Sequence, residues 1–179
     1  MKEETMVEVG KALHHVTASD AYLFSWATKA TLPTSIRVLE RAGWVYATTA
    51  FVWAKTYPKN RKFFKGAGRY TFSNTEDLQL WRKPKAKCWH TNRGWKPGQV
   101  VVMPHPRDPH THKIIHSRKP ETFQHLIDMW LLPQLECDDV RLELFATRSI
   151  PDWLCLGGDV TGNDIFHDLE EYRKNIIVI

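Results

Sequence analysis

Residues 21–54 read AYLFSWATKATLPTSIRVLERAGWVYATTAFVWA, and this stretch decides the fold class. Residues 21–27 form a nearly continuous apolar run of strand length, which is typical of a strand buried on both faces. Residues 44–54 are rich in β-branched and aromatic side chains, so they predict one long strand or two short ones. The stretch therefore predicts two strands with a connection between them.

The connection between these strands predicts a short helix. Pro33 lies at its first turn, where the missing N–H of proline costs no hydrogen bond. Leu32, Ile36 and Leu39 recur at spacings of four and three and would form one apolar stripe. Gly43 would end the helix. A strand, a helix and a strand in succession are typical of an α/β protein.

The same alternation continues along the chain. We expect further strands at residues 77–81, 99–103, 140–146 and 153–156. An amphipathic helix is expected after Pro120, because its apolar positions recur at spacings of three, one and three from Phe123 to Trp130. The 179 residues suffice for one domain and are too few for two of ordinary size. These patterns predict a single α/β domain over residues 1–179, built on a largely parallel sheet.

Composition narrows the class of protein. Hydrophobic residues make up 42% and charged residues 25% of the chain, which is the balance of a globular rather than a disordered protein. The net charge of +5 favours a polyanionic partner such as nucleic acid. The first residues lack the apolar core of a signal peptide, and no apolar run is long enough to span a membrane. Cys88, Cys137 and Cys155 form no CxxC pair, so we expect a cytoplasmic protein without a disulfide framework.

A basic segment and a histidine-rich segment are candidate binding sites. Residues 55–69 contain six Lys or Arg with Phe63 and Phe64 among them, which suits single-stranded or flipped bases; a solvated surface loop is the alternative. The second segment contains four histidines, His105, His110, His112 and His116. A metal site is the alternative there, but the spacing is irregular and no cysteine assists, so we expect a polar loop without metal.

Two further positions suit a small ligand. Gly158 and Asp159 follow a predicted strand, where glycine admits a close ligand and a carboxylate can accept hydrogen bonds from ribose hydroxyls; a simple turn is the alternative. Lys119 precedes the predicted amphipathic helix and could pair with a ligand carboxylate; a solvated charge is the alternative.

Short segments along the chain occur in a characteristic order. They are TM at residues 5–6, YLFSWAT at 22–28, LP at 32–33, GW at 43–44, FVWAKT at 51–56, GRY at 68–70, NTE at 74–76, HSRKP at 116–120, LELFA at 142–146, Trp153 and Gly157. Together they resemble the N6-adenine methyltransferases, the family that includes the writer of methyl marks on eukaryotic messenger RNA and many phage and bacterial DNA enzymes. The resemblance covers roughly residues 5–160, and SRKP and ELFA are its most specific pieces.

The resemblance implies a methyltransferase-type, Rossmann-like sheet with helices on both faces and S-adenosylmethionine as cofactor. Lys119 would then pair with the methionine carboxylate of the cofactor, and Phe145 would line its pocket. Gly158 and Asp159 would lie by the ribose, although the family has Asn and an acidic or amide residue there. The family also has Arg directly after ELFA, whereas here Thr147 precedes Arg148, which we assign to the cofactor.

The resemblance also implies a set of substrate contacts. The loops at residues 55–70 and 104–118 would gate the substrate adenosine, with Glu76 near the base. The residues expected to bind the substrate are Lys55, Arg69, Glu76 and Arg118.

The catalytic Asp-Pro-Pro-Trp of the family has no counterpart in the 179 residues. It would lie upstream of the TM pair, but Thr5 is almost at the start of the sequence. Asp108-Pro109-His110 lacks the second proline and the aromatic residue, and Pro151-Asp152-Trp153 has the wrong order. We therefore name no catalytic residue and expect the N-terminal part of the fold to be missing.

The expected function is methyl transfer from S-adenosylmethionine to N6 of adenine in nucleic acid, in DNA rather than RNA. The alternative is a truncated or non-catalytic relative that acts as a nucleic-acid-binding partner subunit of an active methyltransferase. A neighbouring chain could also supply the missing segment. The expected protein partners are a second methyltransferase subunit or a second copy in a homodimer.

Overall fold

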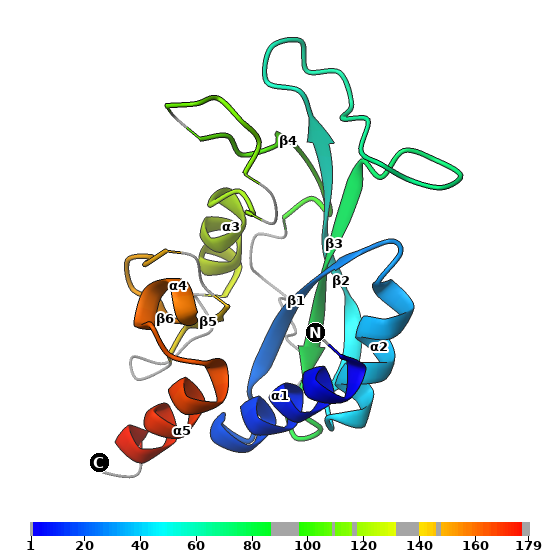
Figure 1. Ribbon diagram of the computed structural model, residues 1–179. Coiled ribbons are helices and arrows are strands. Elements are labelled where there is room, and N and C mark those ends of the chain that lie inside the picture. The colour runs from blue at the N-terminus through cyan, green and yellow to red at the C-terminus, as the bar shows by residue number, and fades with distance from the viewer. Residues whose placement is uncertain are drawn as a thin grey trace.

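The computed structural model describes residues 2–86, 97–108, 110–115, 118–131, 140–145 and 148–176. Its strands form a four-stranded sheet and a separate pair, with helices packed against them (Figure 1). In chain order the elements are α1 (Glu3–Val16), β1 (Tyr22–Thr28), α2 (Leu32–Arg41), β2 (Val45–Thr56), β3 (Thr75–Arg82), β4 (Val100–Pro104), α3 (Thr122–Leu131), β5 (Leu142–Leu144), β6 (Leu154–Leu156), α4 (Gly158–Thr161) and α5 (Ile165–Ile176).

The larger sheet is mixed rather than largely parallel, which corrects the sequence-based expectation. Its order is β1-β3-β2-β4, with β3 antiparallel to both neighbours and β4 parallel to β2. Thus β1, β2 and β4 run in one direction and β3 alone is reversed. The reason is the connection between β2 and β3, residues 57–74, which returns the chain as a hairpin rather than through a helix. The pair β5–β6 is parallel.

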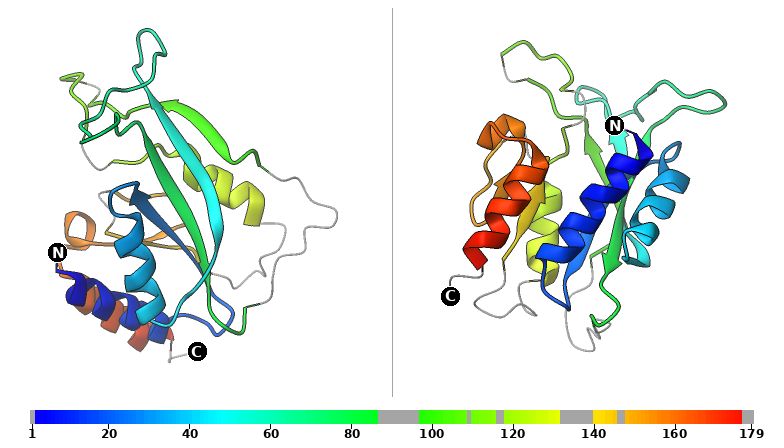
Figure 2. Two further views of the ribbon diagram at one scale, coloured as in Figure 1. Left: turned by 90° about the vertical axis from the view of Figure 1, so that its right-hand side faces the viewer. Right: turned by 60° about the horizontal axis from the view of Figure 1, so that its bottom comes forward.

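Helices cover both faces of the larger sheet, as expected (Figure 2). On one face, α1 and α2 share a core cluster with Trp81 of β3, and Leu23 of β1 packs against this cluster. On the other face, Phe123 and Ile127 of α3 pack with Leu80 of β3. Successive strand residues point to opposite faces, so alternate positions of β1 and β3 supply the two clusters.

Most predicted elements are present, with small differences. Gly43 ends α2 in the left-handed region, at a φ of +94°, and residues 44–54 lie largely in a single strand, β2, whose pairing with β3 shifts register twice. The run at residues 21–27 is only partly buried, because β1 has a single partner within the described sheet. Lys55 was expected in a surface loop, but it lies in β2 and is buried.

Three helices, α1, α4 and α5, were not predicted from the sequence. The signal for α5 was present, because Ile165, Leu169 and Tyr172 recur at helical spacing and pack into the cluster beside α1. None of the helices in the described ranges is both long and apolar enough to cross a bilayer. Cys155 is a buried free thiol in β6, whereas Cys88 and Cys137 lie outside the described residues.

Candidate functional site

A buried carboxylate held between two lysines forms the centre of the candidate site. Lys55 near the end of β2 lies beside Glu76 near the start of the neighbouring strand β3, and their Nζ and Oε1 atoms are 2.5 Å apart. Lys119, just before α3, places its Nζ 2.9 Å from Oε2 of the same carboxylate. The side chains of Lys55 and Glu76 are only 8% and 10% exposed. We call these three residues the lysine–glutamate cluster.

The two lysines set the ionisation of Glu76. Burial by itself raises the pKa of this carboxyl, because it disfavours the charged form. The hydrogen bonds from Lys55 and Lys119 and the positive charge of both lysines outweigh burial, so the pKa of Glu76 lies below its ordinary value. Glu76 is therefore an ionised hydrogen-bond acceptor at neutral pH and is unsuited to donate a proton.

Aromatic rings line the cluster. The Nζ of Lys55 lies 5.1 Å from the ring centroid of Trp53, and that of Lys119 lies 5.6 Å from the ring centroid of Trp26. Both distances fall in the range of cation–π contacts. His105 packs on Trp53 at a centroid distance of 5.3 Å, and burial lowers the pKa of its imidazole. These rings keep water from the charged groups and strengthen their interactions.

A cavity of about 150 Å³ begins at Lys119 and extends to β5. It is lined by Trp26, Arg118, Lys119, Gln124, Glu143, Leu144, Phe145 and Arg148. Three of the residues assigned to the cofactor from the sequence, Lys119, Phe145 and Arg148, thus line one cavity. The added Thr147, which lies outside the described residues, does not keep Arg148 away from it. Arg118, expected on the substrate side, lines the same cavity.

Two groups on the cavity wall have properties that a ligand would satisfy. The Oε1 of Gln124 is buried and has no hydrogen-bond partner, although its Nε2 donates to Oε2 of Glu143 at 3.3 Å. Burial raises the pKa of Glu143, while Gln124 and the charge of Arg148 oppose that rise. A buried acceptor without a partner is unfavourable unless a ligand or water donates to it.

The charges around the cavity do not cancel. The cavity and the adjoining lysine–glutamate cluster together hold four cations and three carboxylates, which leaves one net positive charge. Glu121 is counted because it pairs with Arg148 at 3.1 Å and with Arg118 at 3.5 Å. The cations are Lys55, Arg118, Lys119 and Arg148, and the carboxylates are Glu76, Glu121 and Glu143. A ligand carboxylate could pair with the cations of the cavity wall, and a ligand ammonium group could donate hydrogen bonds to Gln124 and Glu143.

The other predicted ligand contacts lie elsewhere. Gly158 and Asp159 are exposed at the start of α4 and do not line the cavity. Arg69 is exposed in the connection between β2 and β3, with its guanidinium 5.8 Å from the ring centroid of Tyr70. The turn before α4 is instead held by Asp168, whose Oδ2 accepts a hydrogen bond from the Gly157 backbone N–H at 3.0 Å.

The histidines of the irregular segment do not converge. His105 is buried against Trp53, His110 and His112 lie near the tip of their loop, and His116 lies outside the described residues. Within the described ranges, no three His, Cys, Asp or Glu side chains are grouped as ligands of a metal ion.

Sequence reasoning missed Trp26, Gln124 and Glu143 as members of the site. Glu143 and Trp26 lie within segments that carry the family resemblance, so their position in those segments was a usable signal. Gln124 lies on the polar side of an amphipathic helix, where a site residue cannot be distinguished from a solvated one by pattern alone.

Comparison with known proteins gives two matches. The MT-A70 family profile matches residues 1–159, a range that contains the lysine–glutamate cluster and the cavity. The type II methyltransferase M.MunI from Mycoplasma sp is 31% identical to this chain over 150 residues, which are 84% of this chain and 55% of that protein. The chain thus spans about half the length of this curated relative.

Proposed function

The chain belongs to the MT-A70 family of N6-adenine methyltransferase-like proteins, and we propose that it takes part in methyl transfer from S-adenosylmethionine to N6 of adenine in DNA. The observation that carries the proposal is the position of Lys119. Lys119 lines the cavity and its ammonium contacts Glu76, so this residue joins the proposed cofactor site to the proposed substrate site.

The cavity suits the amino-acid end of S-adenosylmethionine. Lys119, with Arg118 beside it, would hold the carboxylate, and Gln124 and Glu143 would accept hydrogen bonds from the ammonium group. Cavities that enclose a whole small molecule measure roughly 300–1,000 Å³, so the described cavity of about 150 Å³ receives part of the cofactor. When bound, the cofactor supplies an activated methyl group.

The remaining cofactor contacts follow from the family resemblance. Phe145 would pack on the cofactor and Arg148 would complete the cavity wall that it lines. Gly158 and Asp159 are proposed to lie near the ribose, at the start of α4.

The substrate side is proposed to lie at the lysine–glutamate cluster. The exocyclic amine of adenine is a poor nucleophile, so it must be positioned and its developing positive charge stabilised. Glu76 is ionised and fixed by two hydrogen bonds, so it can orient a base without titrating at neutral pH. The exposed Arg69 would contact the adjoining phosphates. Lys55 is buried against Glu76 and would hold that carboxylate in place, and Arg118 lines the cavity proposed for the cofactor.

A second candidate function is that of a nucleic-acid-binding partner subunit. The 179 residues contain no Asp-Pro-Pro-Trp tetrapeptide. Within the described sheet β1 pairs only with β3, so its other edge presents backbone groups that a further strand could pair with. We propose that polypeptide outside these residues, such as a second methyltransferase subunit, supplies the tetrapeptide beside this edge.

Calorimetric titration with S-adenosylmethionine tests the cofactor proposal. We expect saturable binding by the chain and a loss of at least about tenfold in affinity for Lys119→Ala, because a charge-assisted hydrogen bond contributes about 1.5–3 kcal/mol. The matched control is Lys11→Ala, which removes an exposed lysine of α1 that pairs with the exposed Glu8. A folded chain that releases no heat on titration would contradict cofactor binding and leave the partner-subunit role.

Transfer of radiolabelled methyl groups tests the reaction. The substrates are three DNA strands, which contain adenine, N6-methyladenine or no adenine, and their comparison separates transfer to N6 from transfer elsewhere. An RNA strand of the same sequence tests the preference for DNA. Label acquired only after a tetrapeptide-bearing polypeptide is added would support the partner-subunit role. Label on the strand without adenine would contradict the proposed target.

A further inference from the structure

A second, larger pocket lies between two loops at the top of the molecule in Figure 1. One is the basic loop, residues 57–74, between β2 and β3; the other is the histidine loop, residues 105–108 and 110–115, after β4. The pocket has a volume of about 490 Å³ and is lined by Tyr57, Pro58, Lys59, Asn60, Arg107 and His112. It shares no lining residue with the cavity at Lys119.

Backbone hydrogen bonds give both loops a defined shape at this pocket. In the basic loop, the Tyr57 N–H donates to the Lys62 carbonyl at 2.9 Å. In the histidine loop, the Asp108 N–H donates to the Lys113 carbonyl at 2.9 Å. The His105 N–H donates to the Thr56 carbonyl at 3.2 Å, which holds the start of the histidine loop beside the end of β2, where the basic loop begins. The pocket is therefore a built part of the fold.

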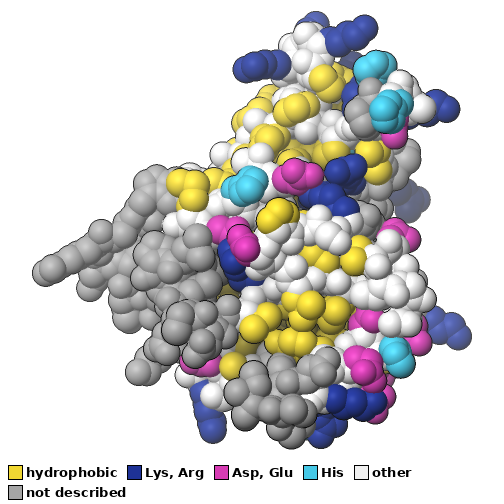
Figure 3. All heavy atoms as spheres, turned by 90° about the vertical axis from the view of Figure 1, so that its left-hand side faces the viewer, with side chains coloured by type: hydrophobic (Ala, Val, Ile, Leu, Met, Phe, Trp, Pro, Cys, Tyr) yellow, Lys and Arg dark blue, Asp and Glu magenta, His cyan; other side chains and the backbone are white. Residues whose placement is uncertain are grey.

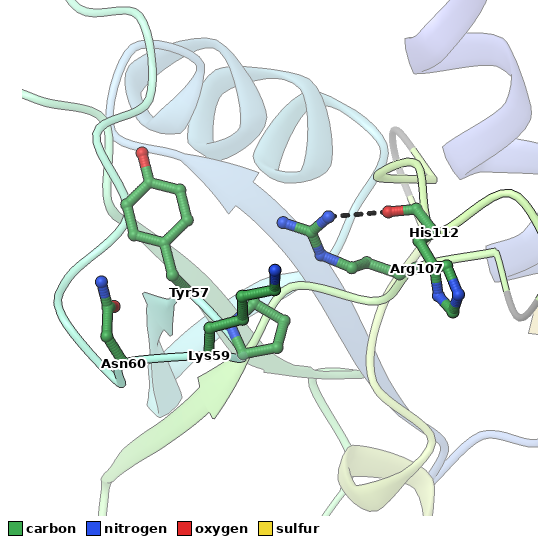
Figure 4. A pocket seen from close by; sticks show the side chains of 6 residues that line it. Tyr57, Lys59, Asn60, Arg107 and His112 are labelled. Carbon is green, nitrogen blue, oxygen red and sulfur yellow. Dashed lines mark hydrogen bonds between the residues drawn. The ribbon is translucent and has the colours of Figure 1, made fainter.

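The charge of the pocket is positive. Figure 4 shows Lys59 and Arg107 pointing toward each other across the space between the loops. Neither side chain forms an ion pair with a carboxylate of the described residues, and the guanidinium of Arg107 is steadied by the His112 carbonyl at 2.7 Å. The neighbouring Asp108 turns into its own loop, where its Oδ1 accepts the backbone N–H groups of His110 and Thr111. Two cations that face each other without a carboxylate favour an anion between them.

Aromatic contacts connect this pocket to the proposed substrate site. The ring of Tyr57 lies 5.2 Å from that of Phe64, which lies 5.6 Å from the ring of His105. His105 in turn packs on Trp53, beneath the ammonium of Lys55. This row of rings leads from a base that stacks on Tyr57 toward a base at the lysine–glutamate cluster.

The basic loop carries further cationic and aromatic side chains outside the pocket. Residues 57–74 contain five Lys or Arg and no Asp or Glu. Figure 3 shows cationic and histidine side chains gathered on the protruding upper part of the molecule. Three aromatic side chains of the loop, Phe63, Tyr70 and Phe72, are exposed. Cations interleaved with exposed aromatic rings are the features with which proteins track single strands.

We propose that this pocket binds a nucleotide of the DNA strand next to the methylated adenine. Its phosphate lies between Lys59 and Arg107, and its base stacks on Tyr57. This inference rests on the proposed function, because it assigns a position along the proposed nucleic-acid substrate. The pocket volume falls within the range of roughly 300–1,000 Å³ for small-ligand sites, which admits one nucleotide.

Fluorescence anisotropy with the full chain tests the site. The probe is a labelled single-stranded DNA with one adenine, in which one phosphate at a time is replaced by a neutral methylphosphonate. We expect a single position near the adenine at which the replacement weakens binding to the unmodified chain. Lys59→Ala should weaken binding about fivefold, and its binding should no longer depend on whether that phosphate is charged. The slope of log affinity against log salt concentration should become shallower by about 0.7.

Three further variants make the result specific. Lys62→Ala removes an equal charge from the same loop but outside the pocket, and it should retain the sensitivity at the critical phosphate. Tyr57→Leu removes the stacking ring and should weaken binding by about fivefold or more, whereas Tyr57→Phe should bind as the unmodified chain does. Thermal unfolding of every variant confirms that the loops remain folded.

The outcomes separate the two proposals. Equal losses for Lys59→Ala and Lys62→Ala, with no phosphate position singled out, would overturn the nucleotide site and leave the proposed function standing. If the unmodified chain binds no single-stranded or duplex DNA, the proposed function fails and the nucleotide site fails with it.

Discussion

Lys119 places its ammonium 2.9 Å from the Glu76 carboxylate, and this contact joins the segment before α3 to the start of β3. The same lysine lines the cavity that extends to β5. A group bound in the cavity and a group bound at Glu76 would therefore both lie beside the same lysine. Because Glu76 also pairs with Lys55, a change at any member of the lysine–glutamate cluster alters the charge balance of the other two.

Glu76→Gln should destabilise the chain by about 3 kcal/mol, because it leaves two lysines close together in a largely buried site without their counter-charge. Urea unfolding measures the change. Glu8→Gln removes the same charge from an exposed pair with Lys11 and should alter the free energy of unfolding by less than about 1 kcal/mol. Equal effects of the two substitutions would show that the cluster makes no special contribution to stability.

Acidification should weaken the fold through Glu76. Its pKa in the folded chain lies below the ordinary value of 4.5, so the unfolded chain binds a proton first as the pH falls. The stabilisation is complete above about pH 4.5 and is lost as the pH falls from there through the lowered pKa. Denaturant unfolding between pH 6 and 3 should show a smaller decline for Glu76→Gln than for the unmodified chain. Parallel curves would contradict this role.

Protonation of His105 should lower the free energy of unfolding at a higher pH than protonation of Glu76 does. Burial lowers the pKa of His105 below the ordinary value of 6.5, partly offset by the Pro106 carbonyl, so the unfolded chain takes up the proton first. The contribution is complete above about pH 6.5 and is lost as the pH falls through the lowered pKa. His14 shifts in the same direction and contributes in the same window. His105→Gln should therefore reduce the pH dependence of the free energy of unfolding there, and His14→Gln should reduce it independently.

The fold could be predicted where one segment fixes its own conformation. The stripe of Leu32, Ile36 and Leu39, followed by Gly43, predicted α2 because helix period and a left-handed end are local properties. The direction of a strand within a sheet is not a local property of its sequence. The reversed strand β3 lies between β1 and β2 because residues 57–74 return as a hairpin, and nothing in the period of those strands encodes that order. The expectation of a largely parallel sheet was wrong for this reason.

The candidate site shows the same division. Lys119, Phe145 and Arg148 were identified from short segments with a family resemblance, and the structure brings them to one cavity. Their roles as ligands remain predictions. The contact of Glu76 with both Lys55 and Lys119 was not predicted, because it depends on which strands are neighbours. Gln124 was missed because only its burial and its orphaned oxygen distinguish it from a surface residue.

Phe145 offers a test of function with little effect on the fold. Phe145 lines the cavity proposed for the cofactor yet is 52% exposed, so Phe145→Ala should change the free energy of unfolding by less than about 1 kcal/mol. The same substitution should weaken S-adenosylmethionine binding about fivefold or more, because removal of the ring takes away apolar contact with the ligand. Phe123→Ala is the matched control: that ring is 1% exposed in the core, so its loss should destabilise by about 3–5 kcal/mol. Urea unfolding and calorimetric titration of both variants separate the two effects. If Phe145→Ala binds the cofactor as the unmodified chain does, the cavity beside β5 is not the cofactor site, and the assignment of Lys119 and Arg148 to that ligand fails with it.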